Sequence, residues 1–236
     1  MKNRIIVAMD VPSRKDAISL AKKLDPSLCR LKVGMELFTA AGPAVVEDLR
    51  NLGFDIFLDL KYHDIPDTVA GAIRSAAGLG VWMANIHCLG GRKIMEAAAN
   101  AVPREVRLLI IGVTILTSMK VTDLREVGID DDESSDPTFP MVRLAQLAKQ
   151  SGLDGVVCSG QEAAAIRKAT DDSFTLVTPG IRLPDGNKND QARIVTPEMA
   201  IQSGASHLVV GRPITGAADP VAALHEFNNR IASVAN

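Results

Sequence analysis

Residues 55–64 read DIFLDLKYHD, a short apolar run that ends in charged and polar side chains. The apolar residues of this run are continuous rather than alternating with polar ones, which is typical of a strand buried on both faces of a parallel sheet. Similar runs occur along the whole chain, separated by longer segments with the period of an amphipathic helix. The predicted strands are Ile5–Met9, Cys29–Val33, Asp55–Leu60, Val81–His87, Val106–Ile115, Gly155–Cys158, Thr175–Thr178 and Ser206–Val210.

Eight strands that alternate with helices in 236 residues predict a (β/α)8 TIM barrel of the α/β class. A doubly wound open sheet is the structural alternative, but such a sheet rarely needs eight parallel strands at this length. Two helix starts are expected: a capping box of Ser159 with Glu162, and an N-cap at Asp219 followed by Pro220. Since no repeat and no Pro/Gly/Ser-rich linker divides the chain, we expect a single barrel domain over residues 1–236.

The composition excludes several classes of protein. Apolar residues make up 47% of the chain and charged residues 23%, and the net charge of −2 gives no reason to expect nucleic acid or an anionic membrane as a partner. Cys29, Cys88 and Cys158 are far apart without a CxxC pair, as expected for buried thiols in a reducing compartment. No signal-peptide pattern is visible, and the longest apolar stretch, Leu108–Leu116, is too short to span a membrane. We therefore expect a soluble, cytoplasmic protein.

Charged residues end or follow the first three predicted strands. They are Asp10, Lys32, Asp59, Lys61 and Asp64. Because residues two apart on a strand point to the same side, Asp59 and Lys61 should project together into the barrel mouth, where barrel enzymes place their active sites. Burying several ions costs several kcal/mol for each before pairing offsets it, so a network that only closes the barrel is the less favoured interpretation.

The residue types in this array limit its chemistry. No Ser or Cys stands beside a histidine, so the array offers no obvious nucleophile–base pair. Asp59 and Asp64 could supply oxygen ligands to a metal ion, but Lys61 between them would compete as a built-in cation. A protonated lysine among carboxylates is suited to delivering a proton to a carbanion. We predict no metal and no cofactor, and interpret His63 and His87 as packing or supporting residues.

A second set of residues suggests a phosphate site. The seventh predicted strand is followed by Gly180, Arg182 and a polar stretch that contains Gln191, and the eighth runs into Gly211 and Arg212. Loops after strands 7 and 8 of a barrel commonly bind phosphate through glycine amides and nearby arginine. Because the chain has no net positive charge, an anionic ligand must be held by such a local cluster of cations.

With these residues the chain resembles the orotidine 5′-monophosphate decarboxylases of the bacterial type, from about Ile5 to Pro220. The stretch DLKYHDIP, residues 59–66, is similar to the family's catalytic signature, and the other matching segments are Val7–Asp10, Lys32–Gly34, Leu116–Ser118, Thr178–Arg182, Asp190–Gln191 and Val210–Pro213. The resemblance implies a cofactor-free lyase of pyrimidine biosynthesis, a homodimer with shared active sites that converts orotidine 5′-monophosphate to uridine 5′-monophosphate. Tyr62, Asp67 and Asn189 depart from the family's usual Phe, Asn and Gly, and none belongs to the array.

The resemblance also implies a role for each matching residue. Lys61 would donate a proton to C6 of the pyrimidine ring, Asp59 would lie beside the departing carboxylate, and Lys32 would bridge the ribose and the charged array. The other residues with implied contacts are Asp10 for the ribose hydroxyls, Thr117 or Ser118 for the pyrimidine edge, Arg182, Gln191, Gly211 and Arg212 for the phosphate, and Asp64, Ile65 and Thr68 for the neighbouring subunit's site.

Two alternatives remain open. A magnesium-dependent 3-keto-L-gulonate 6-phosphate decarboxylase shares an Asp-x-Lys-x-x-Asp signature, although the Lys32–Gly34 and Thr178–Arg182 segments favour the orotidine enzyme. A phosphate-binding barrel that has lost catalysis would be expected to show gaps in the charged array, and no gap is visible.

Overall fold

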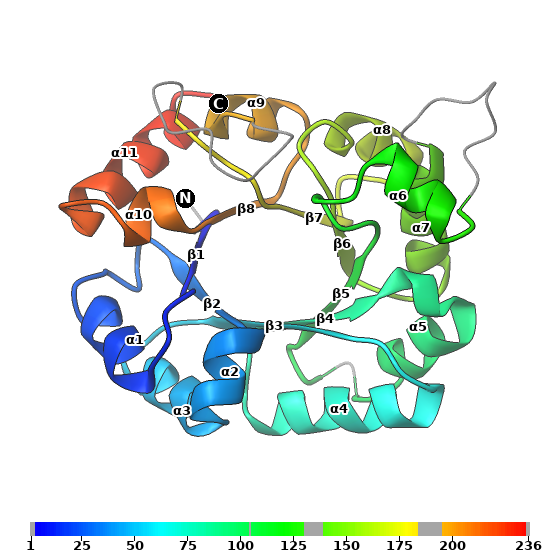
Figure 1. The fold of residues 1–236 in the computed structure, drawn as a ribbon, viewed down its shortest axis with the longest axis horizontal. Helices are drawn as coiled ribbons and strands as arrows, with labels where there is room; N and C mark the ends of the chain where they lie inside the picture. The colour runs from blue at the N-terminus through cyan, green and yellow to red at the C-terminus, as the bar shows by residue number, and fades with distance from the viewer. Residues whose placement is uncertain (1–2, 104, 130–138, 184–194, 235–236) are drawn as a thin grey trace.

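The computed structural model describes residues 3–103, 105–129, 139–183 and 195–234. Within these residues all the predicted strands are present, and they pair in parallel, in chain order, into a closed barrel (Figure 1). The strands are β1 Ile5–Ala8, β2 Arg30–Gly34, β3 Ile56–Tyr62, β4 Met83–His87, β5 Leu109–Val113, β6 Gly155–Val157, β7 Thr175–Thr178 and β8 His207–Val210. The predicted (β/α)8 barrel is therefore confirmed.

Helices surround the barrel and cover the outer face of its strands (Figure 1). They lie between successive strands along the chain, so all the loops that leave the strands meet at one end of the barrel. The helices are α1 Arg14–Ala21, α2 Met35–Ala41, α3 Ala44–Asn51, α4 Pro66–Gly78, the 3₁₀ turn η1 Cys88–Gly90, α5 Arg92–Ala99, α6 Val121–Glu126, α7 Phe139–Gln150, α8 Ala163–Ala169, α9 Pro197–Gln202, α10 Arg212–Thr215 and α11 Pro220–Ala232. Within the described ranges, none of these helices has the length and apolar character needed to cross a membrane.

One of the two expected helix starts is confirmed and the other is wrong. Asp219 caps α11, because its Oδ1 accepts hydrogen bonds from the second and third helical N–H groups at 2.9 and 3.0 Å. By contrast, α8 begins only at Ala163. The Ser159 backbone N–H does donate to the Glu162 carboxylate at 3.1 Å, but the Ser159 hydroxyl is buried without a partner among the described residues. The reciprocal half of the capping box is therefore missing, and the chain turns once more before the helix starts.

Alternate residues of each strand pack on opposite sides of the barrel wall. Ile5 and Val7 of β1 belong to the large apolar layer between strands and helices. Ile6 and Ala8 belong to a second cluster inside the barrel. This inner cluster consists of Ile6, Ala8, Phe57, Met83, Ile111, Val177 and Val209. The barrel interior is therefore a packed core over much of its length, as in other barrels of this type.

The Trp82 ring makes two contacts at the end of the barrel where the strands begin. Trp82 packs edge-on against His207 with ring centroids 5.1 Å apart, and the Arg30 guanidinium lies 4.1 Å from the centroid of the Trp82 ring. Burial and the neighbouring cations Arg30 and Arg4 lower the pKa of His207 to about 4. His207 is therefore neutral at neutral pH, so its ring adds no buried charge at this end of the core.

The third strand is irregular where it enters the barrel mouth. Between two positions paired with β4, strand β3 advances by four residues, from Leu58 to Tyr62, while β4 advances by two. Residues 59–61 therefore face a single residue of β4, Asn85. Lys61 has a φ of 51°, in the left-handed region that residues with side chains rarely adopt. The two-residue alternation expected of this strand therefore stops at Lys61. The side chains of Asp59 and Lys61 nevertheless project together, as predicted.

The cysteines are buried, as expected. Burial raises the pKa of Cys29, Cys88 and Cys158 to about 12 each. Such thiols remain protonated at neutral pH and are poor nucleophiles.

Candidate active site

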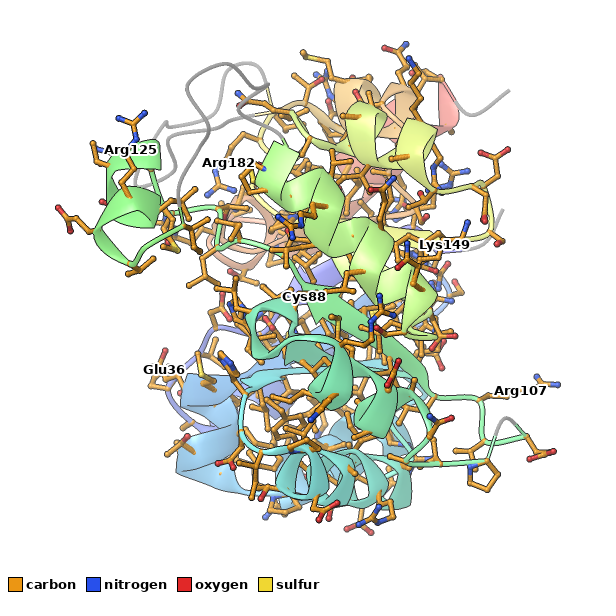
Figure 2. All side chains as sticks on the ribbon, turned by 90° about the vertical axis from the view of Figure 1, so that its right-hand side faces the viewer. Glu36, Cys88, Arg107, Arg125, Lys149 and Arg182 are labelled. Carbon is orange, nitrogen blue, oxygen red and sulfur yellow. The ribbon has the colours of Figure 1, made fainter. Side chains whose placement is uncertain are left out.

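A cavity of about 260 Å³ opens at the end of the barrel where the strands finish. In Figure 2, Glu36, Arg125 and Arg182, which follow strands, lie toward one end of the barrel. Arg107 and Lys149, which precede strands, lie toward the other end (Figure 2). The cavity is lined by Ala8, Asp10, Lys32, Phe57, Asp59, Lys61, Val113, Ile115, Leu116, Thr117, Val157, Pro179, Gly180, Arg182, Val209, Gly211 and Arg212.

Four charged side chains form a continuous chain of ion pairs along one wall of this cavity. Lys32 Nζ lies 3.1 Å from Asp10 Oδ1 and 3.3 Å from Asp59 Oδ2. Asp59 Oδ1 lies 2.7 Å from Lys61 Nζ. The side chains of Lys32 and Asp59 are only 11% and 12% exposed, and that of Lys61 is 27% exposed. The structure thus brings these four predicted residues together, with charges that alternate in sign.

The ion pairs keep the buried members of the chain charged. Burial alone would raise the pKa of Asp59, but Lys32, Lys61 and the hydrogen bonds from Lys61 and Asn85 together bring it below its ordinary value. Burial alone would lower the pKa of Lys32, but Asp59 and Asp10 together bring it above its ordinary value. A carboxylate and an ammonium group are therefore held ionised in a site that excludes much of the solvent.

Asn85 is a member of this site that the sequence analysis missed. Its side chain is fully buried, and its Nδ2 donates to Asp59 Oδ1 at 2.7 Å. Its Oδ1 accepts from the backbone N–H of Lys61 at 2.8 Å. The available signal was a single amide in the middle of the apolar run Val81–His87, because a buried polar side chain needs hydrogen-bond partners.

Gly34 at the end of β2 leaves room for the Lys32 ammonium group. A Cβ atom on Gly34 would lie 3.0 Å from Lys32 Nζ and 3.6 Å from Asp10 Oδ1. The first of these distances is tighter than nearly all contacts of real Cβ atoms, so a side chain here would push against the ammonium group. The position of the Lys32 ammonium group thus depends on residue 34 being a glycine, which has no side chain.

Two arginines lie in the part of the cavity formed by β7, β8 and their loops. Arg182 is 7% exposed, and its Nη1 donates to the Ile181 carbonyl at 2.8 Å. Burial and the nearby positive charge of Arg212 lower the pKa of Arg182. Gly180 and Gly211 line the cavity beside these side chains, and Arg212 begins α10 directly after Gly211. Two arginines that line one cavity beside glycine backbone favour an anionic ligand there. Gln191, the other predicted phosphate contact, lies outside the described residues.

The loop after β5 distinguishes the two residues that the sequence analysis left as alternative contacts for the pyrimidine edge. Thr117 lines the cavity, whereas Ser118 is exposed and is not among the lining residues.

Apolar side chains complete the wall of the cavity, a feature that the sequence analysis did not assign to the site. They are Phe57, Val113, Ile115, Leu116, Val157 and Val209.

Asp64, Ile65 and Thr68 lie outside the cavity of their own chain. All three are exposed, and Ile65 retains 67% of its accessible surface. Asp64 Oδ1 accepts from the backbone N–H of Ile65 at 2.6 Å, in the turn that leads into α4. Within one chain, Asp64 therefore lies apart from the charges that line the barrel mouth.

The two histidines near Lys61 pack against each other. The rings of His63 and His87 stack with centroids 5.3 Å apart, and neither lines the cavity. Burial, His63 and Lys61 lower the pKa of His87. Their arrangement agrees with a packing role. In the described part of the chain, no three His, Cys, Asp or Glu side chains are grouped so as to hold a metal ion.

The geometry is suited to charge stabilisation and proton delivery. Lys61 lines the cavity with its ammonium group held by Asp59, and apolar side chains and two arginines line the same cavity. A carbanion formed beside Lys61 would be stabilised by the preorganised ammonium group and would receive its proton.

Comparisons with known proteins show the family to which the chain is similar. Residues 3–227 match the family model described as the orotidine 5′-phosphate decarboxylase / HUMPS family. A protein of Nitrosomonas europaea named orotidine 5′-phosphate decarboxylase is 56% identical over 232 residues, which cover 98% of each chain. A protein of the same name from Hydrogenovibrio crunogenus is 56% identical over 229 residues, which cover 97% of this chain and 95% of the relative.

Solved structures show the same similarity. The crystal structure of orotidine 5′-phosphate decarboxylase from Lactobacillus acidophilus superposes with a TM-score of 0.84 at 37% sequence identity, covering 97% of this chain and 99% of that one.

Proposed function

The chain belongs to the orotidine 5′-phosphate decarboxylase / HUMPS family, and we propose that it converts orotidine 5′-monophosphate to uridine 5′-monophosphate and carbon dioxide. It is a carboxy-lyase of pyrimidine biosynthesis, the activity that its relatives' names carry at 53–56% identity. The observation that carries the proposal is the buried Asp59 carboxylate between two ammonium groups, in a cavity whose other wall holds two arginines.

We assign the proton transfer to Lys61. When the bond between C6 and the carboxylate breaks, carbon dioxide leaves and the electron pair stays on C6. Lys61 Nζ then gives a proton to C6, and a C–H bond forms. The hydrogen bond of 2.7 Å to Asp59 supports this assignment, because it aims a charged donor into the cavity before the substrate arrives.

Asp59 and Lys32 serve this step differently in the proposal. Asp59 lies beside the departing carboxylate and holds Lys61, while its own charge is maintained by Lys32. Lys32 also pairs with Asp10, whose side chain is 61% exposed and can reach the ribose hydroxyls. The ion-pair chain would thus connect the sugar to the reacting carbon.

The phosphate binds, in this proposal, between Arg182 and Arg212 beside the backbone of Gly211, with Gln191 as a further contact. The pyrimidine edge faces Thr117, the lining residue after β5. Binding energy from a phosphate that does not react can hold the ring in the geometry that the chemical step requires. No metal or cofactor has a role in these steps.

We propose that the active unit is a cytoplasmic homodimer with shared sites. Asp64, Ile65 and Thr68 would complete the partner's cavity. An exposed apolar patch around the turn before α4 supports this, since Ile65 and Leu89 retain 67% and 40% of their accessible surface. The three buried, free thiols support a reducing compartment such as the cytoplasm.

One assay tests the function. Purified protein is mixed with orotidine 5′-monophosphate in EDTA, and the loss of substrate absorbance is followed together with release of carbon dioxide. We expect stoichiometric conversion at a rate that EDTA does not change. Absence of conversion would refute the assignment. Turnover of 3-keto-L-gulonate 6-phosphate that requires magnesium would instead support the related lyase.

A further inference from the structure

We propose that Asn85 is a positioning residue that sets the relative placement of the Asp59 carboxylate and the Lys61 chain, and through them the proton delivered to C6. This inference rests on the proposed decarboxylation. Asn85 does not line the cavity, so it acts through its two neighbours rather than by touching the substrate.

The position of Asn85 in the sheet explains why it can do this. It is the β4 residue opposite the irregular segment 59–61 of β3. The side chain therefore occupies the place where the regular ladder between the two strands is interrupted. Its 0% exposure leaves it no solvent partners, so its hydrogen bonds must be made to the protein.

The two hydrogen bonds of Asn85 have opposite polarity. Its Nδ2 donates to Asp59 Oδ1 at 2.7 Å, and its Oδ1 accepts from the Lys61 backbone N–H at 2.8 Å. The planar amide of asparagine offers a donor and an acceptor on the same carbon without adding charge. An aspartate here would accept from Lys61 but would set a second carboxylate against Asp59.

Both hydrogen bonds bear on the ammonium group of Lys61. Asp59 Oδ1 accepts from Asn85 Nδ2 and from Lys61 Nζ, each at 2.7 Å, so the amide fixes the oxygen that holds the ammonium group. The bond to the Lys61 backbone holds a φ of 51°, which an unsupported lysine would seldom adopt. Asn85 thus restrains Lys61 at its backbone and at its tip.

A purely structural role would also make Asn85 necessary, so the test must separate folding from catalysis. Asn85→Leu removes both hydrogen bonds at similar size, and Asn85→Asp keeps the acceptor and replaces the donor by a carboxyl group. Thr114→Val is the matched control: Thr114 is also fully buried next to the cavity wall, and its Oγ1 donates to the Val157 carbonyl at 3.0 Å. Each variant is assayed for its unfolding midpoint, its kcat and its affinity for uridine 5′-monophosphate.

We expect kcat of folded Asn85→Leu to fall by about 100-fold, the scale of misplacing a reacting group by about 1 Å. Affinity for uridine 5′-monophosphate should stay within about threefold, because that ligand needs no proton from Lys61. The control should lose stability but keep kcat within about threefold. A folded Asn85→Leu with kcat within threefold of wild type, or with kcat and affinity reduced equally, would overturn the proposal.

The pH dependence of Asn85→Asp keeps the proposal testable if Asn85→Leu does not fold. When protonated, the carboxyl group that this substitution introduces can donate to Asp59 and accept from Lys61 much as the amide does, so kcat relative to wild type should rise as pH falls. Taking the ratio to wild type limits the contribution of the other ionisable groups around residue 85, which are Asp59 and Lys61 in contact with it and Asp10, Lys32, His63 and His87 beyond them. A ratio that is flat or falls with decreasing pH would overturn the positioning role. If the wild-type chain itself does not convert the substrate, the proposed function fails, and this inference fails with it.

Discussion

Replacement of Lys61 by alanine removes the proposed proton donor, which is also one of the two cations that face Asp59. General acid catalysis contributes about 10²–10⁴-fold to rate, and a preorganised group that stabilises developing charge contributes about 10²–10³-fold. Because Lys61 supplies both in the proposed mechanism, we expect kcat to fall by about 10⁴-fold or more, which corresponds to about 5.5 kcal/mol of transition-state free energy. Asp59 retains Lys32 at 3.3 Å and the amide of Asn85 at 2.7 Å, so the carboxylate is not left unpaired and the variant should fold.

The assay compares single-turnover decarboxylation with equilibrium binding of uridine 5′-monophosphate. The variant should bind the nucleotide within about tenfold of wild type, because a group that acts in the transition state affects kcat more than ground-state affinity. Lys149→Ala is the control, since Lys149 pairs with Asp171 at the opposite end of the barrel (Figure 2). A Lys61→Ala enzyme with kcat within tenfold of wild type would refute the assigned role.

Three further predictions address other parts of the site. Arg212→Ala should lower kcat/KM for the phosphorylated substrate by an amount equivalent to about 1.5–3 kcal/mol, and should leave kcat/KM for orotidine nearly unchanged. Equal losses for the two substrates would contradict the phosphate assignment. Gly34→Ala should lower kcat by about tenfold or more, because the new Cβ displaces the Lys32 ammonium group. The control is Gly78→Ala, where a new Cβ has no neighbour within 4 Å. Equal activities of the two variants would contradict this prediction. In the proposed dimer with shared sites, mixing the inactive Asp64→Ala and Lys61→Ala variants should restore about a quarter of wild-type activity per protomer, because about half of the reassorted dimers carry one intact site. A mixture that stays inactive after verified subunit exchange would contradict the shared site.

The fold could be predicted from the sequence because each strand is an apolar run that ends at polar residues. In a barrel wall both faces of a strand are buried, so the run is continuous and its end marks the opening. The start of α8 was missed because Ser159 and Glu162 match a capping pattern locally, while the extra turn before Ala163 depends on tertiary packing.

The site could be predicted only where regular geometry connects neighbouring residues. Asp59 and Lys61 meet as expected, but the chain reaches this result through a left-handed backbone at Lys61 rather than a regular strand. Asn85 belongs to a different strand, and only the register between β3 and β4 reveals that it faces the irregular segment. The choice between Thr117 and Ser118 depends on the path of a loop, for which the two-residue period of a strand gives no guidance.

On the inner face of three strands, an apolar residue is followed two positions later by a polar residue of the site. This arrangement bears on how such an enzyme can diverge. Ala8, Phe57 and Met83 belong to the packed interior, and the residues two positions later are Asp10, Asp59 and Asn85. A step of two residues along a strand is about 6.6 Å, so the polar layer lies above the apolar layer, on the same strands or directly after them. Selection can therefore exchange residues of the upper layer, and with them the reaction, while the lower layer continues to supply the stability of the barrel.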